Sequence, residues 1–130
     1  MATWDDVRRL ALALPETTER DRDHSWRVKD KGFAWERPLR KADHEALGDA
    51  APDGPILGVR VADVGVKEAL LAEDADVHFT TPHFDGYPAI LVRLGAIGVP
   101  DLAELLEEAW LVQAPKSLAK AYLAEHPAPR

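Results

Sequence analysis

Two strand-like runs joined by a proline-rich turn constrain the fold of this chain most. Residues 88–94, Pro-Ala-Ile-Leu-Val-Arg-Leu, form an almost continuous apolar run that is typical of a strand in the middle of a sheet. Residues 77–81 also have the composition of a strand. Pro82, the pair Asp85-Gly86 and Pro88 force an irregular turn between the two runs. The segment therefore predicts two strands and, with them, a β-sheet.

A hairpin is predicted earlier in the chain. Residues 16–24 are charged and polar and predict a loop. The run Ser25–Lys29 then alternates apolar and basic residues, as a strand with one buried face does. Asp30-Lys31-Gly32 supplies a turn, and Phe33–Arg37 returns as the second strand.

The other predicted elements are helices, one further strand and a loop. Helices are expected where apolar residues recur every three or four positions and a capping residue or proline stands at one end. The expected helices run from about Trp4 to Leu14, from the cap Asp63 to about Ala72, from Pro100 onward, and from Pro115 to just before His126. Ile56–Val61 is the further strand, and residues 38–55 predict a flexible loop with a helical turn around Asp43–Leu47.

The predicted order is α-β-β-β-α-β-β-α-α within one domain, residues 1–130. Hairpins in the middle and helices towards the ends favour an α+β fold of two layers. We expect a five-stranded antiparallel sheet covered on one side by helices.

Composition restricts the classes of function. The chain has no cysteine, which excludes disulfides, thiolate catalysis and cysteine-based zinc sites. No apolar run approaches the roughly 20 residues that span a bilayer, and the acidic N-terminus is unlike a signal peptide. A cytoplasmic protein is expected. The net charge of −7 disfavours tight nonspecific binding to a polyanion.

The charge is unevenly distributed along the chain. Residues 20–41 hold eight basic and four acidic residues, a net +4, whereas the remainder holds eight basic and nineteen acidic residues, a net −11. This asymmetry indicates either a basic feature on an acidic body or a solvated hairpin rich in long polar side chains.

A basic sheet face is the first candidate site. If the apolar strand residues face the helices, the two-residue period places Arg27, Lys29, Arg60 and Arg93 on the opposite face. Lys31 and Arg37 of the first hairpin join this set. Such a face can bind phosphates. Alternatively, its arginines can cover the sheet and form ion pairs with nearby acidic residues. Both interpretations stay open.

The segment from Phe79 to Leu94, with Ala109-Trp110 and the run Ala114-Pro-Lys-Ser-Leu118 after it, resembles the MmcQ/YjbR-like family of small bacterial proteins. A "TPHxxGYP" segment, a "VRL" strand and an "AW…APK" tail carry the resemblance, which implies the same α+β architecture. It also implies a double-wing DNA-binding shape, in which two hairpins, here Ser25–Arg37 and Phe79–Leu94, straddle a duplex. This chain departs from that picture because its second wing carries no lysine or arginine between Pro82 and Tyr87. Phe84 and Tyr87 can stack on bases or anchor the turn.

A pocket of His83, Tyr87 and Lys116, with Arg93, is the other candidate site, and it would suit a small molecule. No cofactor or metal is predicted. His78 and His83 lie near Asp85, but a metal site needs three well-placed ligands, and nothing in the sequence fixes a third one in position. No catalytic residues are predicted either, since adjacent Lys116 and Ser117 point apart on a helix.

Two functions therefore remain open. The first is a non-enzymatic cytoplasmic protein that binds DNA weakly through the basic hairpin and the sheet face. The second is a protein-interaction or chaperone-like module that takes a partner on an exposed sheet edge or apolar patch and binds no nucleic acid.

Overall fold

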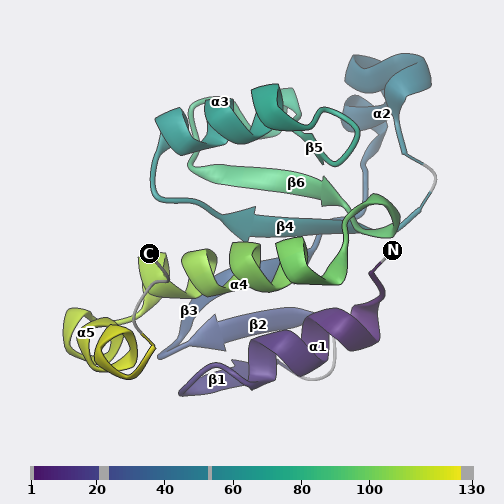
Figure 1. The fold of residues 1–130 in the computed structure, drawn as a ribbon. Helices are drawn as coiled ribbons and strands as arrows, with labels where there is room; N and C mark the ends of the chain where they lie inside the picture. The colour runs from purple at the N-terminus through teal and green to yellow at the C-terminus, as the bar shows by residue number, and fades with distance from the viewer. Residues whose placement is uncertain (1, 21–23, 53, 127–130) are drawn as a thin grey trace.

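The computed structural model describes residues 2–20, 24–52 and 54–126. Its strands are β1 (Thr17–Glu19), β2 (Ser25–Val28), β3 (Lys31–Glu36), β4 (Ile56–Arg60), β5 (His78–Phe79) and β6 (Ala89–Arg93). They pair antiparallel in the order β1-β2-β3-β4-β6-β5 (Figure 1). The predicted antiparallel α+β sheet is confirmed, and β6 has the interior position that its apolar run favours. The prediction of five strands is wrong, because β1 adds a sixth.

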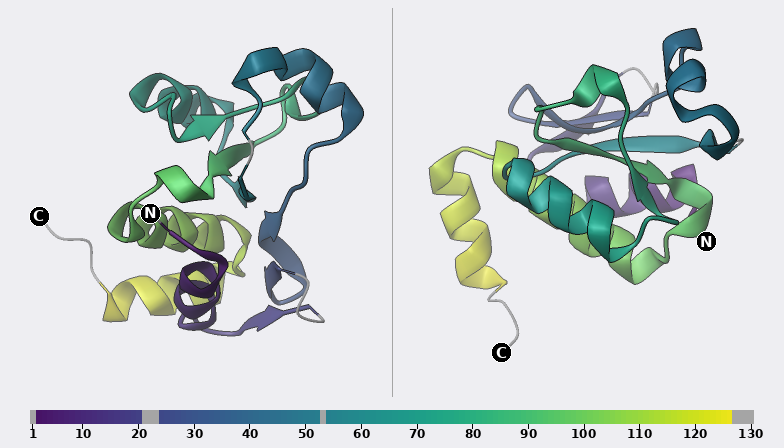
Figure 2. Two further views of the ribbon diagram at one scale, coloured as in Figure 1. Left: turned by 90° about the vertical axis from the view of Figure 1, so that its right-hand side faces the viewer. Right: turned by 90° about the horizontal axis from the view of Figure 1, so that it is seen from above.

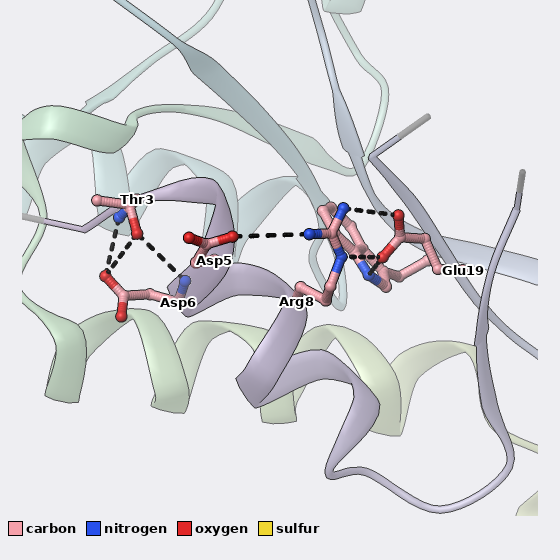
Figure 3. Close-up of polar contacts among 6 residues, drawn as sticks. Thr3, Asp5, Asp6, Arg8 and Glu19 are labelled. Atoms are coloured by element: carbon pink, nitrogen blue, oxygen red, sulfur yellow. Dashed lines mark hydrogen bonds and ion pairs between the residues drawn. The ribbon is translucent and has the colours of Figure 1, made fainter. Parts of the chain in front are cut away.

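β1 lies inside the stretch expected to be a loop, and long-range contacts hold it in the sheet. Arg8 donates two hydrogen bonds to the Glu19 carboxylate, from Nε at 2.7 Å and from Nη2 at 3.0 Å (Figure 3). The Trp26 indole N–H donates a third at 3.1 Å. The Arg8 guanidinium lowers the pKa of Glu19 below its ordinary value. Because Arg8 belongs to the first helix, nothing in the local pattern of residues 16–24 could reveal this strand.

The helices are α1 (Trp4–Leu12), α2 (Lys41–Leu47), α3 (Val64–Glu73), α4 (Val99–Gln113) and α5 (Lys116–Glu125). Thr3 and Asp6 cap α1 reciprocally, as Figure 3 shows, and Asp63 caps α3. α2 and a following 3₁₀ turn, Gly48–Ala50, occupy part of the segment 38–55, where only a loop with one helical turn was expected. Among the described residues, no helix is long and apolar enough to cross a membrane.

The main core lies between the sheet and the layer formed by α1, α3 and α4 (Figure 2). The residues that the two-residue period assigns to this face are all buried in it: Trp26, Val28, Leu57, Val59, Val61, Ile90, Val92 and Leu94. Trp110 of α4 is fully buried among them. The predicted inner face of the sheet is therefore confirmed.

The opposite face carries a second, smaller core, so the expectation of cover on one side only needs correction. Its buried residues are Ile56, Phe79, Phe84, Ala89 and Leu91, and Trp35, Leu39 and Leu47 pack against them. Leu47 belongs to α2, and Phe84 to a 3₁₀ turn, Pro82–Phe84. The continuous apolar runs of β4 and β6 are the sequence signal for this cover, because strands buried on both faces do not alternate.

The turn of the β2–β3 hairpin lies one residue earlier than predicted. Val28 pairs with Lys31, so Lys29 and Asp30 form a two-residue loop, and both have positive φ angles, 48° and 70°. Lys31 and Gly32 belong to β3. A shift in register at Trp26 and Arg27 places Phe33 and Ala34 together in the main core.

Candidate nucleic-acid interface

Part of the second face of the sheet is left uncovered by α2 and the Pro82–Phe84 turn. We call this part the open face and define it by six residues: Arg27, Gly32, Trp35, Gly58, Arg60 and Tyr87. Strand alternation and register place the first five there, since Arg27 pairs with Gly32 and Trp35 with Gly58, and at least one sequence neighbour of each residue enters the main core. Tyr87 joins them from the turn before β6.

Trp35 lies directly against the backbone of β4. A Cβ atom at Gly58 would be 2.6 Å from Cε2 and 2.7 Å from Nε1 of the Trp35 indole, which is closer than carbon atoms approach. Glycine at position 58 therefore permits the indole to cover the strand. Trp35 is only half-buried, so part of its ring is available to a ligand.

Arg60 is held beside Tyr87 at the end of β4. Its Nε donates to the Pro88 carbonyl at 3.2 Å, and its Nη1 donates to the Tyr87 hydroxyl at 3.1 Å. The guanidinium carbon lies 5.1 Å from the centre of the Tyr87 ring, within the range of a cation–π contact. Among the described residues, no carboxylate lies within ion-pair distance of Arg60. Its charge is oriented but not neutralised.

Arg27 and the hairpin tip add further positive charge. Within the described part of the chain, Arg27 forms no ion pair and its buried Nε has no hydrogen-bond partner. Lys29 pairs with Glu16 at 2.8 Å, and both side chains are about half exposed. Lys31 is exposed at the hairpin tip. β3 separates Arg27 from Arg60, which places the two strands about 10 Å apart.

Two arginines of the predicted site have structural roles instead. Arg37 is buried, pairs with Asp43 at 3.1 Å and lies over the Phe84 ring. Burial alone would raise the pKa of Asp43, but the Arg40 backbone N–H and the Arg37 guanidinium lower it below the ordinary value. Neither charge of this pair faces solvent, because α2 covers it.

Arg93 braces the covered part of the second face. Its Nη1 and Nη2 donate to the carbonyls of Ala75 and Ala50 at 3.1 and 3.3 Å, and its guanidinium lies 4.5 Å from the centre of the Phe79 ring. The four basic residues that strand alternation assigns to one face therefore lie in three places. Arg27 and Arg60 lie on the open face, Lys29 lies at the hairpin tip, and Arg93 lies in the covered part of the second face.

Lys67, which was not among the predicted site residues, holds the turn between β5 and β6 in place. Lys67 of α3 is buried, and its Nζ donates to the carbonyls of Phe84 at 2.5 Å and Tyr87 at 3.1 Å. Burial lowers the pKa of Lys67, although Asp85 opposes the shift. Phe84 is buried by this turn, whereas Tyr87 is 44% exposed. Of the two aromatic residues, only Tyr87 presents its ring to solvent.

The other predicted pocket is brought together only in part. His83 and Tyr87 line an open depression of about 490 Å³ together with Trp35, Phe84, Asp85 and Gly86. Lys116 is exposed at the start of α5, and Arg93 lies in the covered part of the second face. Neither residue therefore lines this depression. Within residues 2–20, 24–52 and 54–126, no group of three or more His, Asp or Glu side chains could hold a metal ion.

Comparison with known proteins identifies the family of this chain. A sequence model of the YjbR family matches residues 12–112. The chain is 61% identical over 127 residues to uncharacterized protein Rv2570 of Mycobacterium tuberculosis and to uncharacterized protein Mb2600 of Mycobacterium bovis, covering 95% of this chain and 98% of each relative. The crystal structure of Deinococcus radiodurans protein DR2400, a DUF419 domain, is similar in fold, with a TM-score of 0.63 and 23% identity over 99% of this chain and 91% of that one. The chain therefore belongs to the YjbR family.

Proposed function

We propose that this protein is a non-enzymatic, cytoplasmic nucleic-acid-binding protein that holds a single strand weakly on the open face and the adjoining hairpin tip. The observation that carries the proposal is that the open face combines the partly exposed ring of Trp35 with two arginines, Arg27 and Arg60, that have no carboxylate partner among the described residues. Aromatic rings stack on bases of any sequence, while arginines beside them neutralise phosphates.

A single strand fits this surface better than a duplex does. Trp35 and Tyr87 offer ring surface, which an unpaired base can contact but a stacked base pair cannot. The second hairpin offers a duplex little, since its turn has no lysine or arginine and buries Phe84. The net charge of −7 opposes polyanion binding, so we expect weak affinity that decreases steeply as salt rises.

The alternative, a protein partner on a sheet edge, receives less support. The edge strands β1 and β5 are only three and two residues long, so they offer few backbone groups to a partner strand. Absence of nucleic-acid binding would nevertheless favour a protein partner.

Fluorescence anisotropy with labelled single-stranded and duplex DNA, at low and physiological salt, tests the proposal. The variant Lys29→Glu/Lys31→Glu should lose most of its affinity and reduce the slope of log K against log salt by about 1.4 for a single strand, as expected if two phosphate contacts are lost. Its matched control is Lys116→Glu/Lys120→Glu, which makes the same change of charge on exposed residues of α5.

Tyr87→Ala tests the stacking contribution separately. We expect it to weaken single-strand binding by about 1–3 kcal/mol and to change duplex binding little. Equal losses in the hairpin variant and the α5 control would mean that only net charge matters, and the assigned surface would then be wrong. No binding by the wild-type protein at low salt would overturn the proposed function.

A further inference from the structure

A groove between α3 and α4 lies on the helical side of the sheet, the side opposite the open face. It consists of two cavities of about 350 and 150 Å³ that share Leu105 and Glu108 in their linings. Figure 1 draws β6 and β4 between α3 and α4, and residues of both helices line the two cavities. The two helices cover different strands, since α3 contacts β5 and β6 while α4 contacts β3 and β4.

The larger cavity is apolar. Val61, Ala62, Val66, Leu105, Leu111 and Val112 line it, with Arg60 and Glu108 as its charged residues. Val66, Leu111 and Val112 are only half-buried, so each retains apolar surface that a partner can cover. Arg60, the last residue of β4, lines one end of this cavity, although the Pro88 carbonyl and the Tyr87 hydroxyl hold its guanidinium on the open face.

The smaller cavity is acidic. Glu73, Asp74, Asp101, Glu104 and Glu108 line it, and none of the five forms an ion pair within the described part of the chain. Partial burial and the neighbouring carboxylates of Glu104 and Glu107 raise the pKa of Glu108, which indicates that the negative charges here repel one another. A cationic ligand would relieve this repulsion.

We propose that the α3–α4 groove binds a cationic amphipathic helix of a partner protein. Apolar side chains of that helix, spaced at i, i+4 and i+7, would occupy the larger cavity, and its lysines or arginines would pair with the acidic residues along the smaller one. α3 has ten residues and is therefore about 15 Å long, which matches about three turns of a helix lying beside it. The charge of the groove selects this partner over an anionic or neutral one.

The proposal is tested with a synthetic helical peptide of about three to four turns that has leucines along one face and lysines beside them. Its control peptide has the same composition in an order that spreads the leucines around the helix, so that the charge is kept and the apolar face is lost. Isothermal titration calorimetry at physiological salt should show binding of the first peptide and little binding of the second. Equal binding of both would overturn the proposal, because charge alone would explain it.

Protein variants locate the binding site. Ala62→Trp places an indole in the larger cavity and should abolish binding, whereas Ala72→Trp, an exposed position on α3 outside both linings, should not. Glu104→Gln/Glu108→Gln should weaken binding up to about tenfold, and it keeps the test decisive if Ala62→Trp does not fold. Unchanged binding in the glutamine variant would place the peptide elsewhere. Sedimentation of the protein alone completes the test, because a dimer that dissociates with Ala62→Trp would make a second copy the occupant and overturn the proposal.

Discussion

Gly58 is the residue whose identity the fold restricts most directly. The Trp35 indole occupies the place where a Cβ atom at position 58 would lie. Small size, rather than a special backbone angle, is what position 58 requires, since Gly58 is not among the residues with positive φ.

Gly58→Ala should therefore lower the free energy of unfolding by about 1–3 kcal/mol, because Trp35 must leave its position. The matched control is Gly95→Ala, where nothing lies within 4 Å of the added Cβ, and its effect should stay within about 0.5 kcal/mol. Urea unfolding measures both. The effect of Gly58→Ala should shrink in a Trp35→Leu background, and equal effects in the two backgrounds would show that the indole is not the obstacle.

Asp43 gives the protein a second residue-scale property, a loss of stability in acid. Its pKa is lowered from an ordinary value of 3.8 by the Arg40 N–H and the Arg37 guanidinium, against the effect of burial. A carboxylate whose pKa is lower in the folded state stabilises the fold above its unfolded-state pKa, and this contribution disappears as the pH falls through the folded-state pKa. Protonation would leave the buried Arg37 without its partner.

We expect Asp43→Asn to cost about 3–5 kcal/mol at neutral pH, because a buried charge loses its counter-ion. The decline in stability between about pH 5 and pH 2 should also be shallower in this variant than in the wild-type protein. Urea unfolding across that range tests both expectations. Glu45→Gln, an exposed substitution on the same helix, serves as the control and should leave the profile unchanged.

At the scale of elements, the β2–β3 hairpin has an unfavourable loop sequence. Lys29 and Asp30 both adopt positive φ, a conformation that asparagine and glycine accept much more readily than lysine. The ion pair between Lys29 and Glu16 compensates little, since both side chains are about half exposed. Pairing of the flanking strands thus imposes this turn on the chain.

Replacing the loop with Asn-Gly, as Lys29→Asn/Asp30→Gly, should stabilise the protein by about 1 kcal/mol, because both central residues would then favour the required angles. Thermal unfolding would show the gain as a higher Tm. Asp30→Gly alone should give part of it. A lower Tm for the double variant would indicate that the Lys29–Glu16 pair matters more than the backbone conformation.

At the scale of the whole molecule, Trp110 joins parts of the chain that lie far apart in sequence. It is fully buried in α4, its indole N–H donates to the Pro15 carbonyl at 2.9 Å, and its ring lies 4.9 Å from that of Tyr122 in α5. One side chain therefore connects α4 to the turn that follows α1 and to α5.

Trp110→Ala should cost about 3–5 kcal/mol, as large-to-small changes in cores do. Trp110→Phe should cost less, because it keeps an aromatic ring while losing the hydrogen bond to Pro15. Denaturant unfolding measures both values. A loss below about 1 kcal/mol for the alanine variant would contradict a core role for this residue.

The sequence alone determined the features that depend on local periodicity and capping. The two-residue period assigned Trp26, Val28 and the alternate residues of β4 and β6 to the helical side, and Asp63 marked the start of its helix. The family motif between Thr81 and Pro88 also needed no structure, because it is contiguous.

Tertiary structure alone decided which charged side chains are exposed to a ligand and which are buried with a partner. Arg37 and Arg60 belong to the same predicted basic set, but the first is enclosed with Asp43 under α2, while the second stays open beside Tyr87. β1 and the anchoring of the turn by Lys67 likewise arise from contacts between segments far apart in sequence. A basic or acidic side chain has the same local pattern whether its partner is water or a buried group, and only the packing of distant segments determines which of the two it meets.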